Sequence, residues 1–322
     1  MVTDFFDWYY KRLDEFDADP IYVWQNGKRQ FDQIRKNAGI IYSDGMHYIF
    51  KLPHSRYYKN HRKEFAQLSY LATKKDSTLS LTSELISEKK YKAAGFLCAK
   101  HFIIKQARDY YLISPNLLHG YVDYKTYSEI LRDPYDDVPF QSRVLNRLTS
   151  KSLRSVLKNK RRYLKIMTEE CYDEYVKYLL SSVFEFSDDE HYNNVILCRN
   201  HGSDKFESLF LFDKESNVFN PLIAQGMKFN EVQYYSLIYE KYVGRYIYTP
   251  GETINERISE IGMLIKKGLL PQKYIDFINQ VANFDFAEAA KQVYEETGIK
   301  ADQIQVDMYK YGSELAGQIL SK

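Results

Sequence analysis

The chain has 322 residues and a mass of 38.2 kDa, of which 44% are hydrophobic and 27% are charged. These values are ordinary for a globular protein of roughly two domains and exclude wholesale disorder. The 45 Lys and Arg against 43 Asp and Glu leave a net charge of +2, so bulk charge does not indicate nucleic-acid binding. Cys98, Cys171 and Cys198 have no metal-site spacing and are too few for a disulfide framework.

The N-terminus is acidic, with Asp4 and Asp7, whereas a secretory signal peptide begins with basic residues. No uncharged apolar run reaches the length of about 18 residues that a membrane span requires. We therefore expect a cytoplasmic protein without a membrane partner, with a secreted effector left open. The 30 tyrosines are typical of a tyrosine-rich core and rim, because they do not alternate with cations as a base-stacking groove requires.

The N-terminal part of the chain shows a strong hairpin signal. Residues 5–16 are compatible with a short helix. Residues 38–42 and 46–52 are rich in strand-forming residues and flank Asp44-Gly45, a pair that adopts the tight turn of a β-hairpin. The sequence therefore predicts an antiparallel strand pair that ends before Pro53.

Three further elements are predicted up to Phe102. Residues 60–75 carry apolar side chains at helical spacing, and residues 81–87 and 93–102 are predicted to be strands. Together with the hairpin they predict a small sheet with one helix, which makes the fold class α+β.

Beyond Phe102 the pattern becomes mostly helical, with a loop at residues 133–137. Residues 169–184 form a clear amphipathic helix whose first turn is acidic, which suits the positive end of the helix dipole. From Glu231 onwards we expect four or five helices. Helix stop and start signals in that region are Gly268, Pro271 and Gly298.

A polar segment, residues 187–194, follows the amphipathic helix and leads into a short apolar strand. A second strand at residues 208–212 leads directly into Asp213. In phosphoryl transfer, one aspartate orients the attacking hydroxyl, while an asparagine and a second aspartate hold magnesium. The two strands form a hairpin in this prediction, which would bring the polar segment and Asp213 side by side.

A complementary pair precedes these residues. Lys51 lies on the second strand of the predicted hairpin, and Glu64 lies on the helix that follows. In kinases a strand lysine binds the ATP phosphates and is held by an ion pair with a helix glutamate.

These residues resemble the HipA-like serine/threonine kinases, in particular their compact CtkA-like type. The resemblance rests on the pattern Asp189-x-His191-x-x-Asn194 followed, 24 residues after Asp189, by Asp213 in a Phe-Asp step. It spans residues 38–225. It implies a divergent, bilobal protein-kinase-like fold, with a β-rich N-lobe at residues 1–104 and a larger, mainly helical C-lobe at residues 105–322.

The resemblance also implies roles for individual residues, with ATP and magnesium as cofactors and a protein substrate. Asp189 would be the catalytic aspartate, and His191 would brace its loop. Lys51 would bind the ATP phosphates, and Glu64 would position Lys51. Asn194 and Asp213 would coordinate magnesium.

The chain also departs from the family pattern. Residues 36–41 contain one glycine, Gly39, where a phosphate-binding loop has several, and Asp213 is followed by Lys214 instead of glycine. Asp188 competes with Asp189 for the catalytic assignment. Two alternatives therefore stay open, a pseudokinase that acts as a protein-binding scaffold and an enzyme of the same fold that transfers AMP.

Residues 151–165 are strongly basic, and Leu153, Val156, Leu157 and Leu164 form an apolar stripe at helical spacing. Such a run is typical of a solvated helix face. The alternative is a docking surface for a partner protein or nucleic acid, whose binding to phosphates would depend steeply on salt.

Overall fold

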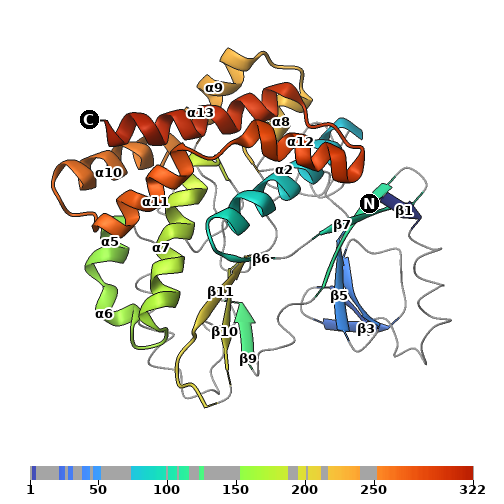
Figure 1. Ribbon diagram of the computed structural model, residues 1–322, viewed down its shortest axis with the longest axis horizontal. Coiled ribbons are helices and arrows are strands. Elements are labelled where there is room, and N and C mark those ends of the chain that lie inside the picture. Colours follow the sequence, from blue (N-terminus) through green and yellow to red (C-terminus); the bar gives the residue numbers. More distant parts are fainter. Residues whose placement is uncertain are drawn as a thin grey trace.

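The computed structural model combines α-helices and β-strands and is mostly helical, with strands in two sheets (Figure 1). Within the described residues no helix is long and apolar enough to cross a membrane. The structure describes residues 2–4, 22–25, 28–31, 38–43, 46–51, 74–98, 101–106, 109–115, 123–126, 153–187, 195–200, 202–211, 217–239 and 252–321. The predicted helix at 5–16, the loop at 133–137 and most of the predicted helix at 60–75 lie outside them.

The larger sheet has seven described strands in the order β1-β7-β8-β5-β4-β2-β3. All neighbouring strands in it are antiparallel except β1 and β7, which run parallel. Its strands are β1 Val2–Asp4, β2 Tyr22–Gln25, β3 Lys28–Phe31, β4 Ala38–Ser43, β5 Met46–Lys51, β7 Phe102–Gln106 and β8 Asp109–Pro115.

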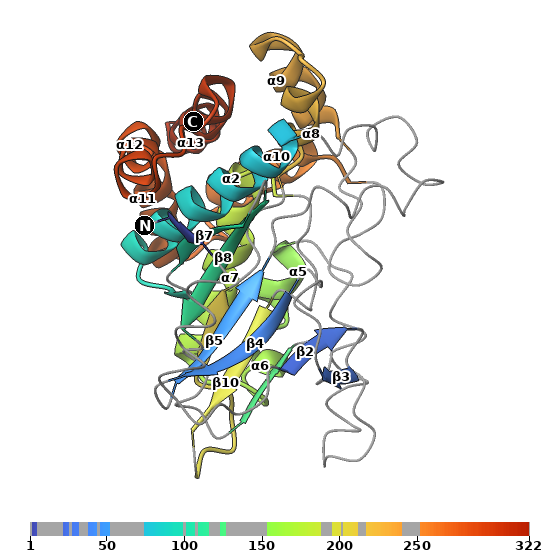
Figure 2. The ribbon, with the colours of Figure 1, turned by 90° about the vertical axis from the view of Figure 1, so that its right-hand side faces the viewer.

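The predicted hairpin is confirmed as β4 and β5. The two strands pair from Ser43 opposite Met46 to Ala38 opposite Lys51, so the intervening turn has two residues, as an Asp-Gly turn requires. On its other side β5 pairs with β8, which places this hairpin in the interior of the sheet (Figure 2).

The smaller sheet has the order β6-β11-β10-β9. Its centre is the second predicted hairpin, which is confirmed by the antiparallel pairing of β10 with β11. The expectation of a mostly helical chain beyond Phe102 is confirmed for the described residues, although β7, β8 and β9 occupy much of residues 102–126. The strands of this sheet are β6 Leu97–Cys98, β9 Asp123–Thr126, β10 Val195–Arg199 and β11 Ser208–Leu211.

The predicted strand at residues 81–87 is wrong, because the chain is helical there. It lies inside α2, Lys74–Ala93, whose residues 79–87 are all buried. The stretch is buried on every side, and its buried side chains include the polar Thr82, Ser83 and Glu84, so no polar face marks a helical period there. The twenty-residue length of the element, which a buried strand does not reach, is what identifies the helix.

The predicted strand at residues 93–102 is replaced by a helix end and two short strands. Gly95 adopts a positive φ of 82° just after α2, and β6 and β7 follow separately. The predicted domain boundary between residues 104 and 105 falls inside β7.

The amphipathic helix at 169–184 is confirmed as α7, and the helical C-terminal part is confirmed as α9 to α13. Gly268 and Gly298 adopt positive φ at the ends of α10 and α12, and Pro271 immediately precedes α11. The helices after α2 are α5 Leu153–Lys158, α6 Lys160–Tyr163, α7 Glu169–Phe184, α8 Phe219–Ala224, α9 Phe229–Ile238, α10 Ile254–Lys266, α11 Gln272–Ala282, α12 Phe286–Thr297 and α13 Gln303–Leu320.

The core lies among α2, α7 and the C-terminal helices. Helix α13 contacts α7, α8 and α9 as well as α10, α11 and α12, and α2 contacts α8 and α12. Figure 1 shows α13 running across the upper part of the view, with α2 and α7 below it. The same continuous core includes Ile103 of β7 and Leu112 of β8, which joins the larger sheet to the helices.

Candidate functional site

The sequence-predicted site residues fall into two groups. Gly39 and Lys51 lie on β4 and β5. The others lie outside the described residues, so their predicted roles stay predictions: Glu64, Asp189, His191, Asn194 and Asp213. Within the part of the chain that the structure describes, no three His, Cys, Asp or Glu side chains gather as a metal site.

Strand pairing places Gly39 and Lys51 close together in the larger sheet. Lys51 pairs with Ala38, the neighbour of Gly39, and on its other side with Leu112. Leu112 in turn pairs with Ile103, and both of these side chains are fully buried. The candidate phosphate-binding lysine is therefore on an interior strand that is fixed from both sides.

The two acidic segments of the sequence, 188–194 and 212–216, are bounded by residues that pair with one another. Ser187, before the first segment, forms an antiparallel bridge with Asn217, after the second. Val195, after the first segment, pairs with Leu211, before the second. The two residues that flank the first segment are thus each paired with a residue that flanks the second. The Cα atoms of paired residues lie about 5 Å apart.

The first of these junctions begins in an unusual turn at the C-terminus of α7. Ser187 N–H donates to the Ser182 carbonyl (3.1 Å) and Phe186 N–H to that of Val183 (3.3 Å). This is the Schellman pattern of helix termination, in which the left-handed position is usually glycine. Here it is Phe186, with φ of 54°, and it is the one described non-glycine residue with positive φ.

The ring of Phe186 explains how this strained conformation is held. It is fully buried, stacks on Tyr311 and meets Phe219 edge-on, with ring centroids 6.1 and 6.2 Å away. A non-glycine residue in the left-handed region costs on the order of 1–3 kcal/mol and persists where its surroundings fix it.

A buried ion pair lies beside the same turn. Lys90 of α2 pairs with Glu185, and their side chains are only 2% and 3% exposed. Lys90 Nζ also donates to Ser181 Oγ (2.7 Å), and Tyr91 OH donates to the second Glu185 oxygen (2.6 Å). All the charged atoms of the pair thus have hydrogen-bonding partners, which a charge pair away from water requires.

Helix α13 holds the junction from the opposite side. The hydroxyl of Tyr309 accepts a hydrogen bond from Asn217 Nδ2 (3.1 Å), and Ser83 and Ser87 of α2 are its polar neighbours. Burial raises the pKa of Tyr309 above its ordinary value, although these three polar side chains act to lower it. Gly312, one turn later, leaves room for α7: a Cβ there would lie 1.9 Å from the Phe184 carbonyl oxygen.

Sequence analysis missed two acidic residues of α2, the buried Glu84 and the half-buried Glu88, because it did not predict this helix. Glu88 accepts hydrogen bonds from His101 N–H and Nδ1, each at 2.9 Å, and Glu84 Oε1 lies 3.8 Å from His101 Nε2. Burial alone would raise the pKa of Glu88, but the hydrogen bonds and charge of His101 lower it overall. Had residues 74–93 been predicted as a helix, Glu84 and Glu88 would have been candidates, in addition to Glu64, for the helix glutamate that pairs with the strand lysine.

The basic run forms α5 and α6. Leu153 and Val156 are buried and Leu157 and Leu164 are partly buried, so the predicted apolar stripe is confirmed. The cations border a surface recess of about 700 Å³. The recess is lined by Lys158, Asn159, Lys160, Arg161, Arg162 and Leu164.

Comparison with known proteins finds similarity among solved structures only. No family model and no curated protein matches the chain. The Helicobacter pylori proinflammatory kinase CtkA has a TM-score of 0.47 and 12% identity over 93% of both chains. Shewanella oneidensis HipA, in its complex with HipB and operator DNA, has a TM-score of 0.49 and 11% identity over 98% of this chain and 70% of its own.

Both are HipA-like kinases, the family that the sequence resembles. A third solved structure, the choline kinase LicA from Streptococcus pneumoniae, is also similar, with a TM-score of 0.23 and 10% identity over 90% of this chain and 92% of its own.

Proposed function

We propose that the chain is an ATP-dependent kinase that phosphorylates serine or threonine hydroxyls of a protein, with a bilobal fold and the nucleotide between its lobes. One observation carries this proposal. The segments with Asp189 and Asp213 start and end at paired residues, Ser187 with Asn217 and Val195 with Leu211. That pairing supports the convergence of two aspartates that phosphoryl transfer requires.

The candidate residues have the chemistry that this reaction needs. Asp189 would accept the proton of the hydroxyl as its oxygen attacks the γ-phosphorus, and the bond to the β-phosphate oxygen would break to release ADP. Asn194 and Asp213 offer amide and carboxylate oxygens, the ligands that magnesium prefers. Magnesium, when bound, neutralises charge on the phosphates. His191 would hold the Asp189 loop in place.

Lys51 would bind the ATP phosphates and needs a helix carboxylate to orient it. Glu64 is the partner that the sequence predicts. Glu84 is a second candidate, because it is 2% exposed on α2, the described helix that follows the lysine strand. Glu64→Gln and Glu84→Gln, compared for their KM for ATP, distinguish the two.

The direct test measures transfer from γ-labelled ATP, either to the chain itself or to a generic protein substrate. Wild-type protein should incorporate label only with magnesium, and Asp189→Asn and Asp213→Asn should each abolish incorporation. If both variants label as well as wild type, the site assignment is wrong. Asp188→Asn serves as the matched control and should retain activity. If Asp188→Asn is inactive and Asp189→Asn is active, Asp188 is the catalytic aspartate instead of Asp189.

The pseudokinase alternative is favoured by Gly39, which pairs regularly with Phe50 inside the sheet and so does not lie in a glycine-rich loop. A thermal shift with magnesium and ATP addresses it. A nucleotide-binding protein gains about 2.7 kcal/mol at a hundredfold excess over Kd, and a scaffold that binds no nucleotide gains nothing. Intact-mass measurement of the product separates phosphate transfer from the other alternative, AMP transfer.

We further propose that the basic face of α5 and α6 binds an acidic partner protein or nucleic acid. Its exposed cations include Arg161 and Arg162, which border the recess. Replacing both with alanine should weaken binding to an oligonucleotide or an acidic peptide and reduce its salt dependence. Lys300→Ala with Lys310→Ala removes the same charge from exposed sites elsewhere and should change neither.

A further inference from the structure

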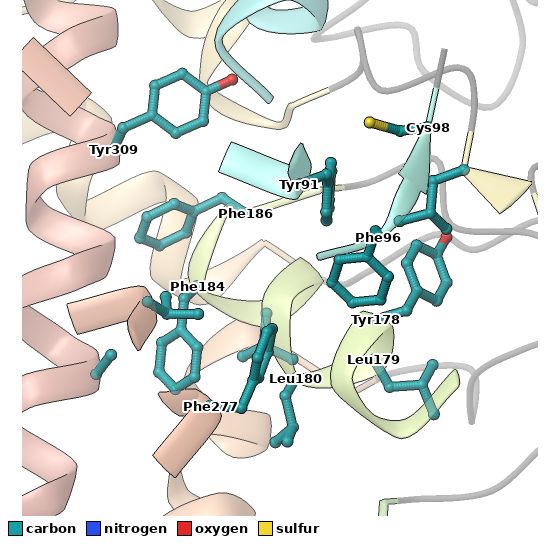
Figure 3. Packing of buried hydrophobic residues seen from close by; sticks show 14 of the residues in the cluster. Tyr91, Phe96, Cys98, Tyr178, Leu179, Leu180, Phe184, Phe186, Phe277 and Tyr309 are labelled. Carbon is teal, nitrogen blue, oxygen red and sulfur yellow. The ribbon is translucent and has the colours of Figure 1, made fainter. Parts of the chain in front are cut away.

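The C-terminal helix α13 reaches the junction of the two acidic segments although nothing in its sequence predicts a role there. Three of its residues, Tyr309, Tyr311 and Gly312, touch the end of α7 or the residue that follows the second segment. In Figure 3 the side chains of Phe184, Phe186 and Tyr309 lie between the end of α7 and α13.

The Tyr309 hydroxyl connects three separate elements at this point. It lies on α13, has the polar side chains of Ser83 and Ser87 of α2 as neighbours, and accepts the hydrogen bond from Asn217. Asn217 in turn is bridged to Ser187, the residue after the strained Phe186. A single buried hydroxyl is therefore linked to the residue before one acidic segment and the residue after the other.

The surroundings of Tyr309 allow little movement. Its ring stacks on Phe286 (4.9 Å between centroids) and meets Phe219 edge-on (5.1 Å), and its side chain is fully buried. Asn217 is 3% exposed. Because a rigid ring fixes where the hydroxyl lies, the hydroxyl can fix where Asn217 lies.

We propose that Tyr309 and Asn217 are positioning residues, whose hydrogen bond holds the entry to residues 188–194 and the exit from residues 212–216 in one register. This inference rests on the proposed kinase function, since those segments contain the candidate catalytic and metal-binding side chains. A misplacement of about 1 Å at a reacting group can reduce a rate about a hundredfold. The positioning pair therefore affects the rate of transfer without touching the nucleotide.

The decisive variant is Tyr309→Phe, which keeps the ring and removes only the hydroxyl. Its matched control is Tyr274→Phe, because Tyr274 is equally buried and donates its own hydrogen bond to Asp173 (2.7 Å). Asp173 lies 11 residues before Phe184 on α7, or about 16 Å along the helix. Both variants lose one tyrosine hydroxyl from the same core, but only Tyr309→Phe loses it at the junction.

Two readouts distinguish positioning from a general loss of stability. Tyr309→Phe should lower kcat about tenfold with the KM for ATP within twofold of wild type, while Tyr274→Phe leaves kcat unchanged. Amide hydrogen exchange in peptides covering residues 185–195 and 212–217 should be faster in Tyr309→Phe than in Tyr274→Phe. If Tyr309→Phe does not fold, Asn217→Ala is measured in its place.

The results separate this inference from the function on which it rests. An active wild type with equal kcat and equal exchange in the two tyrosine variants overturns the positioning role and leaves the kinase intact. A wild type that neither binds nor uses magnesium and ATP overturns the kinase function, and the inference with it. The double variant Tyr309→Phe with Asn217→Ala should lose about as much kcat as either single variant, because both substitutions remove the same hydrogen bond. A loss equal to the product of the two single losses would contradict the proposal.

Discussion

The two ends of α7 are both held by ion pairs, but in opposite environments. At its N-terminal end Glu169 pairs with Lys160, and these side chains are 56% and 37% exposed. At its C-terminal end Glu185 pairs with Lys90 almost completely away from water. The strained Phe186 occurs only at the buried end, and that end leads into the candidate catalytic segment.

The difference indicates what each end contributes. An exposed pair adds little stability because water and salt screen it. A buried pair gains little net stability over apolar residues, yet it is sensitive to the loss of either partner. We infer that the buried end fixes a single backbone path for the chain that follows, whereas the exposed end needs only to begin a helix.

The largest expected effect is at the buried pair. Glu185→Ala should destabilise the protein by about 3–5 kcal/mol, because it leaves the Lys90 ammonium buried without its counter-charge. Glu169→Ala, at the other end of the same helix, should change stability by less than about 1 kcal/mol. Urea unfolding of both variants measures the two values.

A double variant sharpens this result. Lys90→Met with Glu185→Leu removes both charges and should recover much of the stability that Glu185→Ala loses. Equal destabilisation by Glu185→Ala and Glu169→Ala would show that the two ends of α7 do not differ in the way proposed.

The second prediction uses two glycines of the C-terminal helices. Gly312→Ala should destabilise the protein by about 1–3 kcal/mol or more, because the new Cβ would overlap the Phe184 carbonyl oxygen. Gly262→Ala in α10 should instead stabilise it by about 0.5–1 kcal/mol, since alanine is the better helix former. Its new Cβ would lie 3.8 Å from Ile319, an ordinary contact. Thermal unfolding that gives both substitutions the same sign would contradict the close approach of α13 to α7.

The third prediction concerns the N-terminal end alone. Thr168 caps α7 by accepting the Cys171 N–H at its hydroxyl oxygen (3.2 Å). Thr168→Ala should destabilise the protein by about 1 kcal/mol, as the loss of a helix cap usually does. Thr168→Ser retains the hydroxyl and should lose markedly less in the same urea titration. Neither variant should change hydrogen exchange in residues 185–195, and a change there would mean that the two ends are coupled.

Much of α7 and its surroundings could be predicted from sequence. Its full length followed from the stripe of Tyr172, Val176, Leu179 and Val183 with acidic residues in the first turn, and both hairpins followed from alternation and turn residues. These signals are local, which is why periodicity and turn chemistry are enough to detect them.

The buried end could not be predicted in the same way. Lys90 and Glu185 are 95 residues apart in sequence, and Asn217 and Tyr309 are 92 apart. A lysine and a glutamate on helices are ordinarily solvent-exposed, so only tertiary packing shows that they meet. The left-handed Phe186 has no sequence signal at all, because glycine is the residue expected at that position.

The smallest expected effects are pH dependences of opposite sign. Glu88 of α2 has its pKa lowered below the ordinary 4.5, so its contribution to stability is present above pH 4.5 and is lost as the pH falls through the lowered value. Burial raises the pKa of Glu174 in α7 above 4.5, against the bond that it accepts from Leu209 N–H. Its ionisation therefore reduces stability as the pH rises from 4.5 through the raised value.

Unfolding free energies measured across this range test both signs. Glu88→Gln should remove part of the acid-side loss of stability, and Glu174→Gln should remove part of the decrease that appears as the pH rises above 4.5. Because each glutamine keeps the shape of the side chain and cannot titrate, the difference from wild type isolates one carboxyl group. Identical pH profiles for the two variants would contradict this prediction. The two carboxyl groups have different partners, since Glu88 bonds to the imidazole of His101 and Glu174 to the backbone amide of Leu209.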